Sequence, residues 1–165
     1  MRDVVCLIPM TEDGFNAYIE RGTINYAEEN ARAGYWPTAE ALGKSHQAYE
    51  KLLPEGMATE GHYFYSIEEV KHGRKVGILW LAVRRGTARP SGFVYDLSID
   101  ERFRRRGYAT QAMRVLEGKA RELGLEAIAL HVFTHNPAAV GLYKNLGYDV
   151  KSINMVKELS LGGEG

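Results

Sequence analysis

The stretch from Arg104 to Thr110 combines positive charge, small residues and a predicted helix start in a way that suits phosphate binding. It reads Arg-Arg-Arg-Gly-Tyr-Ala-Thr and lies between a predicted strand and a predicted helix. A tight turn into a helix leaves backbone N–H groups without partners and places the positive end of the helix dipole there. Gly107 and Ala109 let the backbone approach phosphate oxygens closely, and guanidinium groups add charge. We therefore expect a diphosphate site, although three arginines before a helix are also typical of a solvated surface.

Two common classes of phosphate site are excluded by the motifs, and polyanions are disfavoured by the charge. The chain contains no Gly-Lys-Ser or Gly-Lys-Thr of a P-loop and no dinucleotide glycine fingerprint. Lysine plus arginine number 21 and aspartate plus glutamate number 21. With no net positive field, Arg102 together with the 104–106 arginines is a weak candidate for a nucleic-acid patch, and we expect no nucleic-acid or membrane partner.

The elements that would position this turn alternate between strand and helix periodicity. The predicted order is a strand, two helices, three strands, a helix, a strand, a helix and two closing strands. We expect an α/β (α+β) fold with a mixed sheet and helices on its faces. Strands are predicted at 4–8, 62–67, 76–83, 93–99, 127–133, 148–150 and 153–156, and helices at 14–33, with Gly22 as a candidate break, 38–53, 107–123 and 137–146.

The size and hydropathy of the chain predict one compact domain over residues 1–160, followed by a disordered tail at 161–165. The apolar run before Pro9 is too short for a signal peptide, and no run elsewhere is long enough to span a bilayer. We therefore expect a cytoplasmic protein, either a monomer or a homodimer.

Two motifs in the second half resemble the GNAT superfamily of N-acetyltransferases. Residues 104–109 match its Q/R-x-x-G-x-G/A motif, with Ala109 in the permitted small position. Residues 131–148 resemble its closing motif, which has a strand, Asn136 at a helix start, Leu142-Tyr143 and Gly147-Tyr148. The likeness covers 93–159 closely and the first 90 residues loosely, and it points to a poorly characterised bacterial branch. It implies a mostly antiparallel sheet of six to seven strands with four helices.

The resemblance implies acetyl-coenzyme A as the acetyl donor and no metal. In this family the glycine-containing turn binds the coenzyme A pyrophosphate, and the pantetheine arm pairs with the backbone of the fourth strand where the fourth and fifth strands separate. The implied cofactor-binding residues are Leu97, Ser98, Ile99, Arg104, Arg105, Arg106, Gly107, Tyr108, Ala109, Thr110, Asn136, Ala139 and Tyr143.

Acetyl transfer to an amine needs a base for the amine and an acid for the departing thiolate. The resemblance makes Tyr143 the acid, although a helical tyrosine could equally belong to the core. The resemblance also makes His131 the first candidate for the base, because it stands on the fifth strand twelve residues before Tyr143, where some protein-acetylating relatives carry a glutamate; its unperturbed pKa near 6.5 would suit the task. Asp96 is the rival, with a side chain that regular alternation places opposite Tyr95 and that a bulge could reverse. A water chain could also replace a single base.

The acceptor is predicted to be a primary amine on a small molecule or a protein. The first helix, the loop after it and the fourth strand offer a carboxylate and aromatic rings, a combination that suits a cation. The candidate substrate-binding residues are Tyr26, Glu29, Tyr35, Trp36 and Tyr95, although the pattern around Glu28 and Glu29 favours solvated helix residues. The alternative to an enzyme is a module that binds or senses acyl-coenzyme A without turnover.

Overall fold

The computed structural model of the chain describes residues 4–86, 88–133 and 136–160. The chain divides into two compact units, Met1–His131 and Val132–Gly165, and each is considered by itself. The predicted tail at 161–165 lies outside the described residues.

The first unit is built on a sheet in which the strands follow one another in chain order. Over the described residues this sheet has five strands, and β4 and β5 are parallel while all other neighbours are antiparallel. A parallel pair needs a crossover, which α3 provides. The strands are β1 (Val5–Pro9), β2 (His62–Glu69), β3 (Arg74–Arg84), β4 (Ser91–Ile99) and β5 (Ala127–Leu130), and the helices are α1 (Glu12–Arg32), α2 (Thr38–Leu52) and α3 (Tyr108–Glu122), with short 3-10 turns η1 (Gly56–Ala58) and η2 (Glu101–Phe103).

Helix α1 begins at a side-chain cap and continues past the glycine that was a candidate break. The hydroxyl of Thr11 accepts a hydrogen bond from the Gly14 N–H at 3.0 Å, which satisfies one of the free donors of the first turn. At Gly22 the helix is uninterrupted, and a Cβ there would lie 2.9 Å from the hydroxyl oxygen of Tyr49 on α2. The glycine therefore makes room for a neighbouring side chain and does not end the helix.

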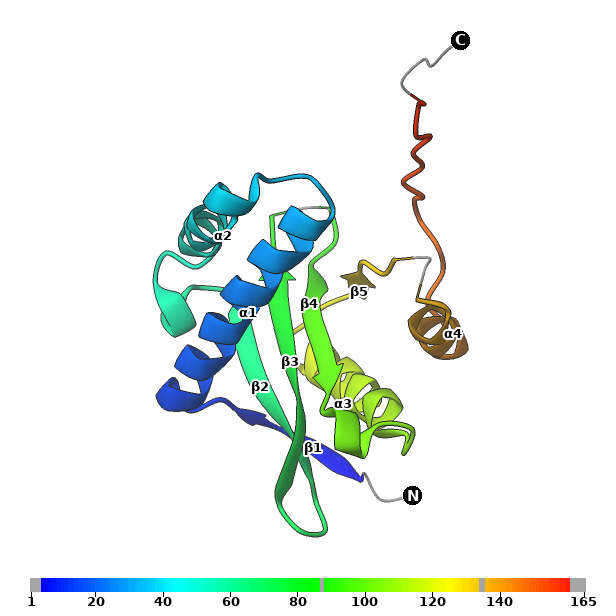
Figure 1. The fold of residues 1–165 in the computed structure, drawn as a ribbon. Coiled ribbons are helices and arrows are strands. Elements are labelled where there is room, and N and C mark those ends of the chain that lie inside the picture. The colour runs from blue at the N-terminus through cyan, green and yellow to red at the C-terminus, as the bar shows by residue number, and fades with distance from the viewer. Residues whose placement is uncertain (1–3, 87, 134–135, 161–165) are drawn as a thin grey trace. The chain divides into compact units, whose positions relative to one another are not determined.

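Helices α1 and α3 cover opposite faces of the sheet (Figure 1). The ring of Phe64 on β2 lies 4.7 Å from that of Phe15 on α1, whereas the next residue, Tyr65, has the Lys119 ammonium of α3 at 5.6 Å from its ring centre. Successive side chains of a strand point to opposite faces of the sheet, so the helix that contacts Phe64 and the helix that contacts Tyr65 lie on opposite faces.

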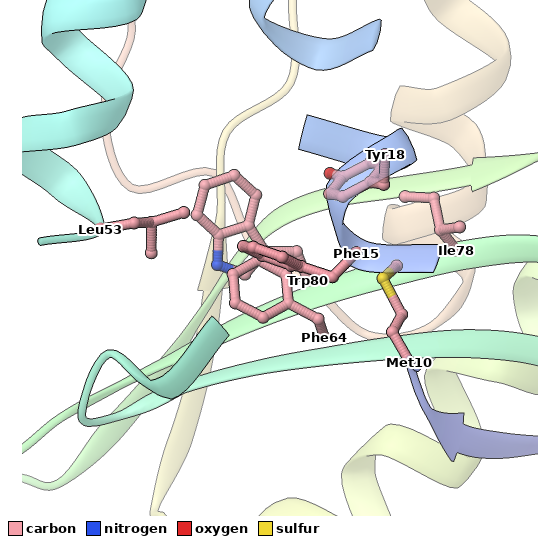
Figure 2. Packing of buried hydrophobic residues seen from close by; sticks show 7 residues of the cluster. All are labelled: Met10, Phe15, Tyr18, Leu53, Phe64, Ile78 and Trp80. Atoms are coloured by element: carbon pink, nitrogen blue, oxygen red, sulfur yellow. The ribbon is translucent and has the colours of Figure 1, made fainter. Parts of the chain in front are cut away.

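The α1 face of the sheet carries an aromatic core, and the α3 face an aliphatic one. Figure 2 shows the first of these, in which Phe15 and Tyr18 of α1 meet Phe64 and Trp80 of the sheet. Its remaining buried members are Met10, Leu53 and Ile78. On the other side, Leu79 and Leu81 of β3 and Met113 and Leu116 of α3 are fully buried. Burial of this apolar surface is the main force that holds both layers on the sheet.

The second unit contains the short helix α4 (Pro137–Asn145), close to the predicted bounds. Asn136 caps it, because its side-chain oxygen accepts a hydrogen bond from the Ala139 N–H at 3.2 Å. Proline in the first turn and Gly147, with φ of 95°, after the last turn complete the boundary signals.

The two closing strands expected at 148–150 and 153–156 are not formed, so the predicted count of six to seven strands is not reached in the described chain. Residues 148–160 have no regular secondary structure, and Ile153, Met155 and Val156 are 68%, 86% and 84% exposed. Alternating apolar residues predict a strand only if a neighbouring strand accepts its hydrogen bonds. In the described sheet β5 pairs with β4 alone.

Candidate functional site

The turn between β4 and α3, residues 104–107, has the backbone geometry of an anion-binding site. We call this turn the cradle. After η2 the chain turns through Arg105, with φ of 64°, and Gly107, with φ of 81°, and then enters α3. Among the described residues Arg105 is the only non-glycine residue with a positive φ. Left-handed residues in a tight turn aim successive N–H groups into one concavity, which is a common way to bind phosphate oxygens.

The start of α3 is open to a ligand. No side chain caps its first turn, and a Cβ placed on Gly107 would meet no atom within 4 Å. The free backbone donors and the helix dipole are therefore available beside a position where no neighbouring atom crowds the backbone. The residues present fit the paired phosphates that the sequence predicted, including Ala109 and Thr110 in the first turn of the helix.

The arginines of the turn are held in defined places. The Nε of Arg104 donates to the carbonyl oxygen of Ile99 at 2.8 Å, which ties the turn to the end of β4. The guanidinium carbons of Arg102 and Arg106 lie 4.8 Å and 5.8 Å from the ring centre of buried Phe103. Such ring-face contacts leave the guanidinium N–H groups able to bind an anion, so positive charge is concentrated beside the cradle.

Tyr108 contributes its backbone to this region while its side chain is buried elsewhere. Its hydroxyl donates to Glu69 Oε2 at 2.7 Å, and the two residues are 7% and 6% exposed. The Arg74 guanidinium also contacts that oxygen at 2.9 Å. These contacts of Glu69 were not predicted from the sequence, because it stands beside Glu68 at the end of a strand and has the pattern of a solvated turn residue.

Strand β4 carries a bulge that places Tyr95 and Asp96 on the same face. Trp80 is paired with Asp96 and Leu81 with Val94, so Tyr95 is an extra residue on β4. The ring of Tyr95 stacks on Trp80 at 4.7 Å, and Asp96 bonds to Tyr18 of α1. Regular alternation had placed the two side chains on opposite faces unless a bulge intervened, and the structure contains such a bulge, which shifts the pleat by one residue.

The far part of β4 has one open edge. Pairing with β5 runs from Ser91 to Val94 and ends at Leu130 on β5, whereas β4 itself continues to Ile99. From Tyr95 onward no strand of the described chain pairs with β4 on the side opposite β3. Leu97, Ser98 and Ile99, the predicted partners of a pantetheine arm, lie in this segment, which can accept an added strand-like ligand.

Asp96 is a partly buried carboxyl with an unusually high affinity for a proton. Burial raises its pKa above the ordinary 3.8, and the nearby Glu29 charge acts in the same direction, against the hydrogen bonds from Tyr18 and the Leu97 backbone. The Tyr18 hydroxyl donates to Asp96 Oδ2 at 2.6 Å. Burial and Asp96 raise the pKa of Tyr18, so its phenol stays protonated and orients the carboxylate.

A chain of ring contacts leads from the loop after α1 to this carboxyl. We call it the aromatic chain, and it runs through Trp36, Tyr26, Tyr49, Trp80 and Tyr95 with successive ring centres at 5.3, 6.2, 6.3 and 4.7 Å. Its members Tyr26 and Tyr95 are 41% and 36% exposed, so a ligand can reach them.

Four of the five predicted substrate residues gather around the aromatic chain. Tyr26, Trp36 and Tyr95 are members of it. Burial and Asp96 raise the pKa of Tyr49, another member, to about 12. The charge of exposed Glu29 contributes to this increase, which links Glu29 to the same group. Tyr35 takes no part in these ring contacts and is 77% exposed.

The other predicted catalytic residues lie at the end of the first unit and in the second. His131 is exposed and directly follows β5, which ends at Leu130 and not at the predicted Phe133. In the second unit Tyr143 lies in α4, and its ring is 5.8 Å from that of Tyr148. Asn136 and Ala139 form the cap of that helix.

A family model for the acetyltransferase (GNAT) family matches residues 24–148. The chain belongs to this family. The matched range contains the cradle, the β4 bulge and α4. The relatives of this GNAT protein include two Bacillus subtilis (strain 168) proteins named uncharacterized N-acetyltransferases. YdgE is 41% identical over 150 residues, which is 91% of this chain and 95% of that protein, and YycN is 35% identical over 155 residues, which is 94% and 99%.

The GNAT fold is also seen in a solved relative. The crystal structure of YycN from Bacillus subtilis superposes with a TM-score of 0.84 at 35% identity and covers 94% of this chain and 98% of that one. Within the part of this GNAT chain that is described, no group of His, Cys, Asp or Glu is arranged to hold a metal ion. Nor does any described helix have the length and hydropathy needed to cross a membrane.

Several residues around Asp96 and the aromatic chain were not predicted from the sequence. Tyr18 and Tyr49 stand in apolar helix stripes and Trp80 in a dense apolar strand, so each pattern indicated core alone. His62, the first residue of β2, accepts a hydrogen bond from Trp80 Nε1 at its Nδ1 atom at 3.0 Å, and burial lowers its pKa. The signal that could have found them is a polar tip on an otherwise apolar position, since buried hydroxyl and indole groups need partners.

Proposed function

We propose that this GNAT protein transfers an acetyl group from acetyl-coenzyme A to a primary amine by direct attack in a ternary complex. The observation that carries the proposal is the cradle, with left-handed Arg105 and Gly107 at the uncapped start of α3. When bound, acetyl-coenzyme A supplies the acetyl group as an activated thioester. The cradle would hold its paired phosphates, and the open edge at Leu97, Ser98 and Ile99 would pair with the amide groups of its arm.

Asp96 is the residue that we assign as the base. An amine attacks only as the neutral species, so the site must remove a proton from an ammonium group. A raised pKa makes the carboxylate a better acceptor, and Tyr18 fixes the orientation of its oxygen. His131, which is exposed directly after the end of β5, is the alternative base.

Tyr143 is assigned as the acid for the departing sulfur. This assignment rests on the position of Tyr143 in the closing GNAT motif, in α4 after the Asn136 cap. A phenol with an ordinary pKa near 10 can donate a proton to a thiolate as the carbon–sulfur bond breaks.

The acceptor is proposed to be a cationic amine. Asp96 and Glu29 supply negative charge, while Tyr26, Trp36 and Tyr95 offer ring faces that attract ammonium groups. Removal of one proton by Asp96 would convert the bound cation into the nucleophile at the place where it is needed.

The proposal is tested by calorimetry with coenzyme A and by a thiol-release screen of amines with acetyl-coenzyme A. We expect saturable coenzyme A binding, a rise in melting temperature by mass action, and turnover with at least one cationic amine. Absence of binding at millimolar coenzyme A would contradict the proposed function. Binding without turnover across the panel would instead favour an acyl-coenzyme A sensor.

Replacing the assigned acid separates chemistry from binding. For Tyr143→Phe we expect kcat to fall more than tenfold while the Kd for coenzyme A changes less than twofold, because the ring remains and only the proton donor is lost. Tyr63→Phe on β2 is the matched control and should leave both values unchanged. Wild-type turnover of Tyr143→Phe would refute the assignment.

A further inference from the structure

The β2–β3 hairpin contacts the residues on both sides of the cradle. Directly after the cradle in the chain, the hydroxyl of Tyr108 in the first turn of α3 donates to Glu69 Oε2 at 2.7 Å. Directly before it, the ring of Phe103 in η2 has the guanidinium carbon of Arg74 at 5.5 Å from its centre. Glu69 and Arg74 are themselves a pair across the last rung of the hairpin.

These contacts close a ring of interactions around the cradle. Arg74 Nη2 contacts Glu69 Oε2 at 2.9 Å, so the same carboxylate oxygen receives the hairpin arginine and the helix tyrosine. The path runs from Glu69 to Tyr108, back through the four residues of the turn to Phe103, and through Arg74 to Glu69. We call these four side chains the loop clamp.

Three of the four side chains of the loop clamp are buried, which makes their interactions costly to break, whereas the Arg74 side chain is 50% exposed. Glu69, Phe103 and Tyr108 are each 7% exposed or less. A buried carboxylate must keep its donors, because an ion without partners in a dry site is strongly unfavourable. The hydrogen bonds from Tyr108, His72 and Arg74 hold the pKa of Glu69 at about 2, so the group stays ionised.

Contacts that hold the cradle are needed because its backbone conformation is intrinsically unfavourable. Arg105 is held in the left-handed region, where an L residue is disfavoured by roughly 1 kcal/mol or more. Such a conformation persists only if the surroundings determine it. An unclamped turn would sample other conformations, and a ligand would then have to order it at a cost to affinity.

We propose that Glu69, Tyr108, Arg74 and Phe103 form a device that preorganises the cradle for the donor's phosphates, with Glu69 and Tyr108 as positioning residues outside the reacting groups. This proposal rests on the proposed function, because it explains how the same cradle gains affinity for the donor. The hairpin tip, far along the chain from the cradle, thereby controls donor binding and leaves the acceptor region alone.

The test compares coenzyme A binding and steady-state kinetics of the wild type, Tyr108→Phe, Arg74→Gln and the double variant. Tyr108→Phe removes the hydroxyl that bonds to Glu69, together with its contact to Arg106, while keeping the buried ring. We expect its Kd for coenzyme A and its KM for acetyl-coenzyme A to rise about fivefold, with kcat at saturating donor and KM for the amine within twofold. Arg74→Gln should also raise the Kd for coenzyme A. The loss of binding free energy in the double variant should be smaller than the sum of the two single losses, because each change releases the same turn.

His72→Gln is the matched control. His72 also contacts Glu69 but lies in the hairpin turn and makes no link to the cradle. We expect its donor affinity to stay within twofold of the wild type. Equal weakening by His72→Gln would show that the charge state of Glu69, and not the link to Tyr108, sets affinity, and would overturn the clamp.

The outcomes separate the clamp from the function beneath it. If the wild type fails to bind coenzyme A, the proposed function is lost. If the wild type binds and folded Tyr108→Phe and Arg74→Gln bind equally well, only the clamp is wrong. A variant with a uniform loss in kcat and in both KM values, together with a lower melting temperature, would show a purely structural role and would also overturn it. If one variant does not fold, the other decides.

Discussion

Asp96 shows how two neighbours set the chemistry of one carboxyl. Burial raises its pKa, and the hydrogen bond from the Tyr18 hydroxyl at 2.6 Å lowers it. The two effects oppose one another, so removing the hydrogen bond should move the pKa further from 3.8 in the upward direction. The carboxylate would then begin to lose its proton-accepting form at a higher pH.

The pH dependence of kcat/KM tests this assignment. If Asp96 is the base, Asp96→Asn should lower kcat more than tenfold, and Tyr18→Phe should shift the acidic limb of the profile to higher pH. His131→Gln should leave the limb in place. A limb near pH 6.5 that disappears in His131→Gln and is unmoved in Tyr18→Phe would transfer the role to the histidine.

At the level of residues, the sequence showed the groups that carry charge but not their partners. The arginines and Gly107 of the cradle were recognisable because glycine and charge before a helix have a direct physical meaning. Tyr18 and Glu69 were not, since their roles depend on contacts 78 and 39 residues away along the chain. Pairings at that separation exist only once the sheet has formed.

Strand β4 depends on a close approach that only glycine permits. Gly77 on β3 is paired with Ile99, and a Cβ there would lie 2.2 Å from the carbonyl oxygen of Ser98. Because that atom belongs to the backbone, the strand itself would have to move. Position 77 therefore fixes the segment that we assign to the donor's arm.

Gly77→Ala should destabilise the fold and displace the arm-binding segment. We expect a loss of roughly 1–3 kcal/mol and a fall in melting temperature of roughly 2–12 °C, with weaker donor binding. Gly43→Ala on α2 is the control, since nothing lies within 4 Å of its added methyl group and alanine favours helices. A Gly77→Ala protein with unchanged stability would contradict the close packing of the strands.

At the level of elements, periodicity predicted α1, α2, α3, α4 and the first four strands, and it failed at sheet edges. The pattern does not locate the bulge at Tyr95, because large apolar residues fall regularly at positions 93, 95, 97 and 99 and no break in alternation marks it. Strand β5 ends before Val132, and the closing segment stays without strand pairing. Where a strand stops depends on its partner, which a pattern within one segment does not contain.

The stability of the first unit as a whole should respond to acid through Glu69. Its pKa is about 2 in the folded chain against an ordinary 4.5, so between these values the unfolded chain binds more protons. The contribution of Glu69 is fully present above pH 4.5 and is lost as the pH falls toward 2.

Denaturant unfolding at several pH values measures this contribution. Glu69→Gln should be less stable than the wild type at pH 6, and the difference should shrink between pH 4.5 and 2. Glu68→Gln, one residue earlier on the same strand, should keep the wild-type pH profile. A Glu69→Gln protein whose deficit is the same at pH 6 and pH 3 would contradict the depressed pKa.

The open edge of β4 also bears on how the molecule behaves in the absence of a ligand. From Tyr95 onward, no other strand of the described sheet pairs with this edge, although the Ile99 carbonyl oxygen accepts a hydrogen bond from Arg104 and the Leu97 N–H donates to the Asp96 carboxyl. An unpaired edge is a template on which a foreign strand can add, and such edges favour aggregation. Under the proposed function, the segment assigned to the donor's arm is therefore also a site at which copies of the chain could associate, and a bound donor would shield it.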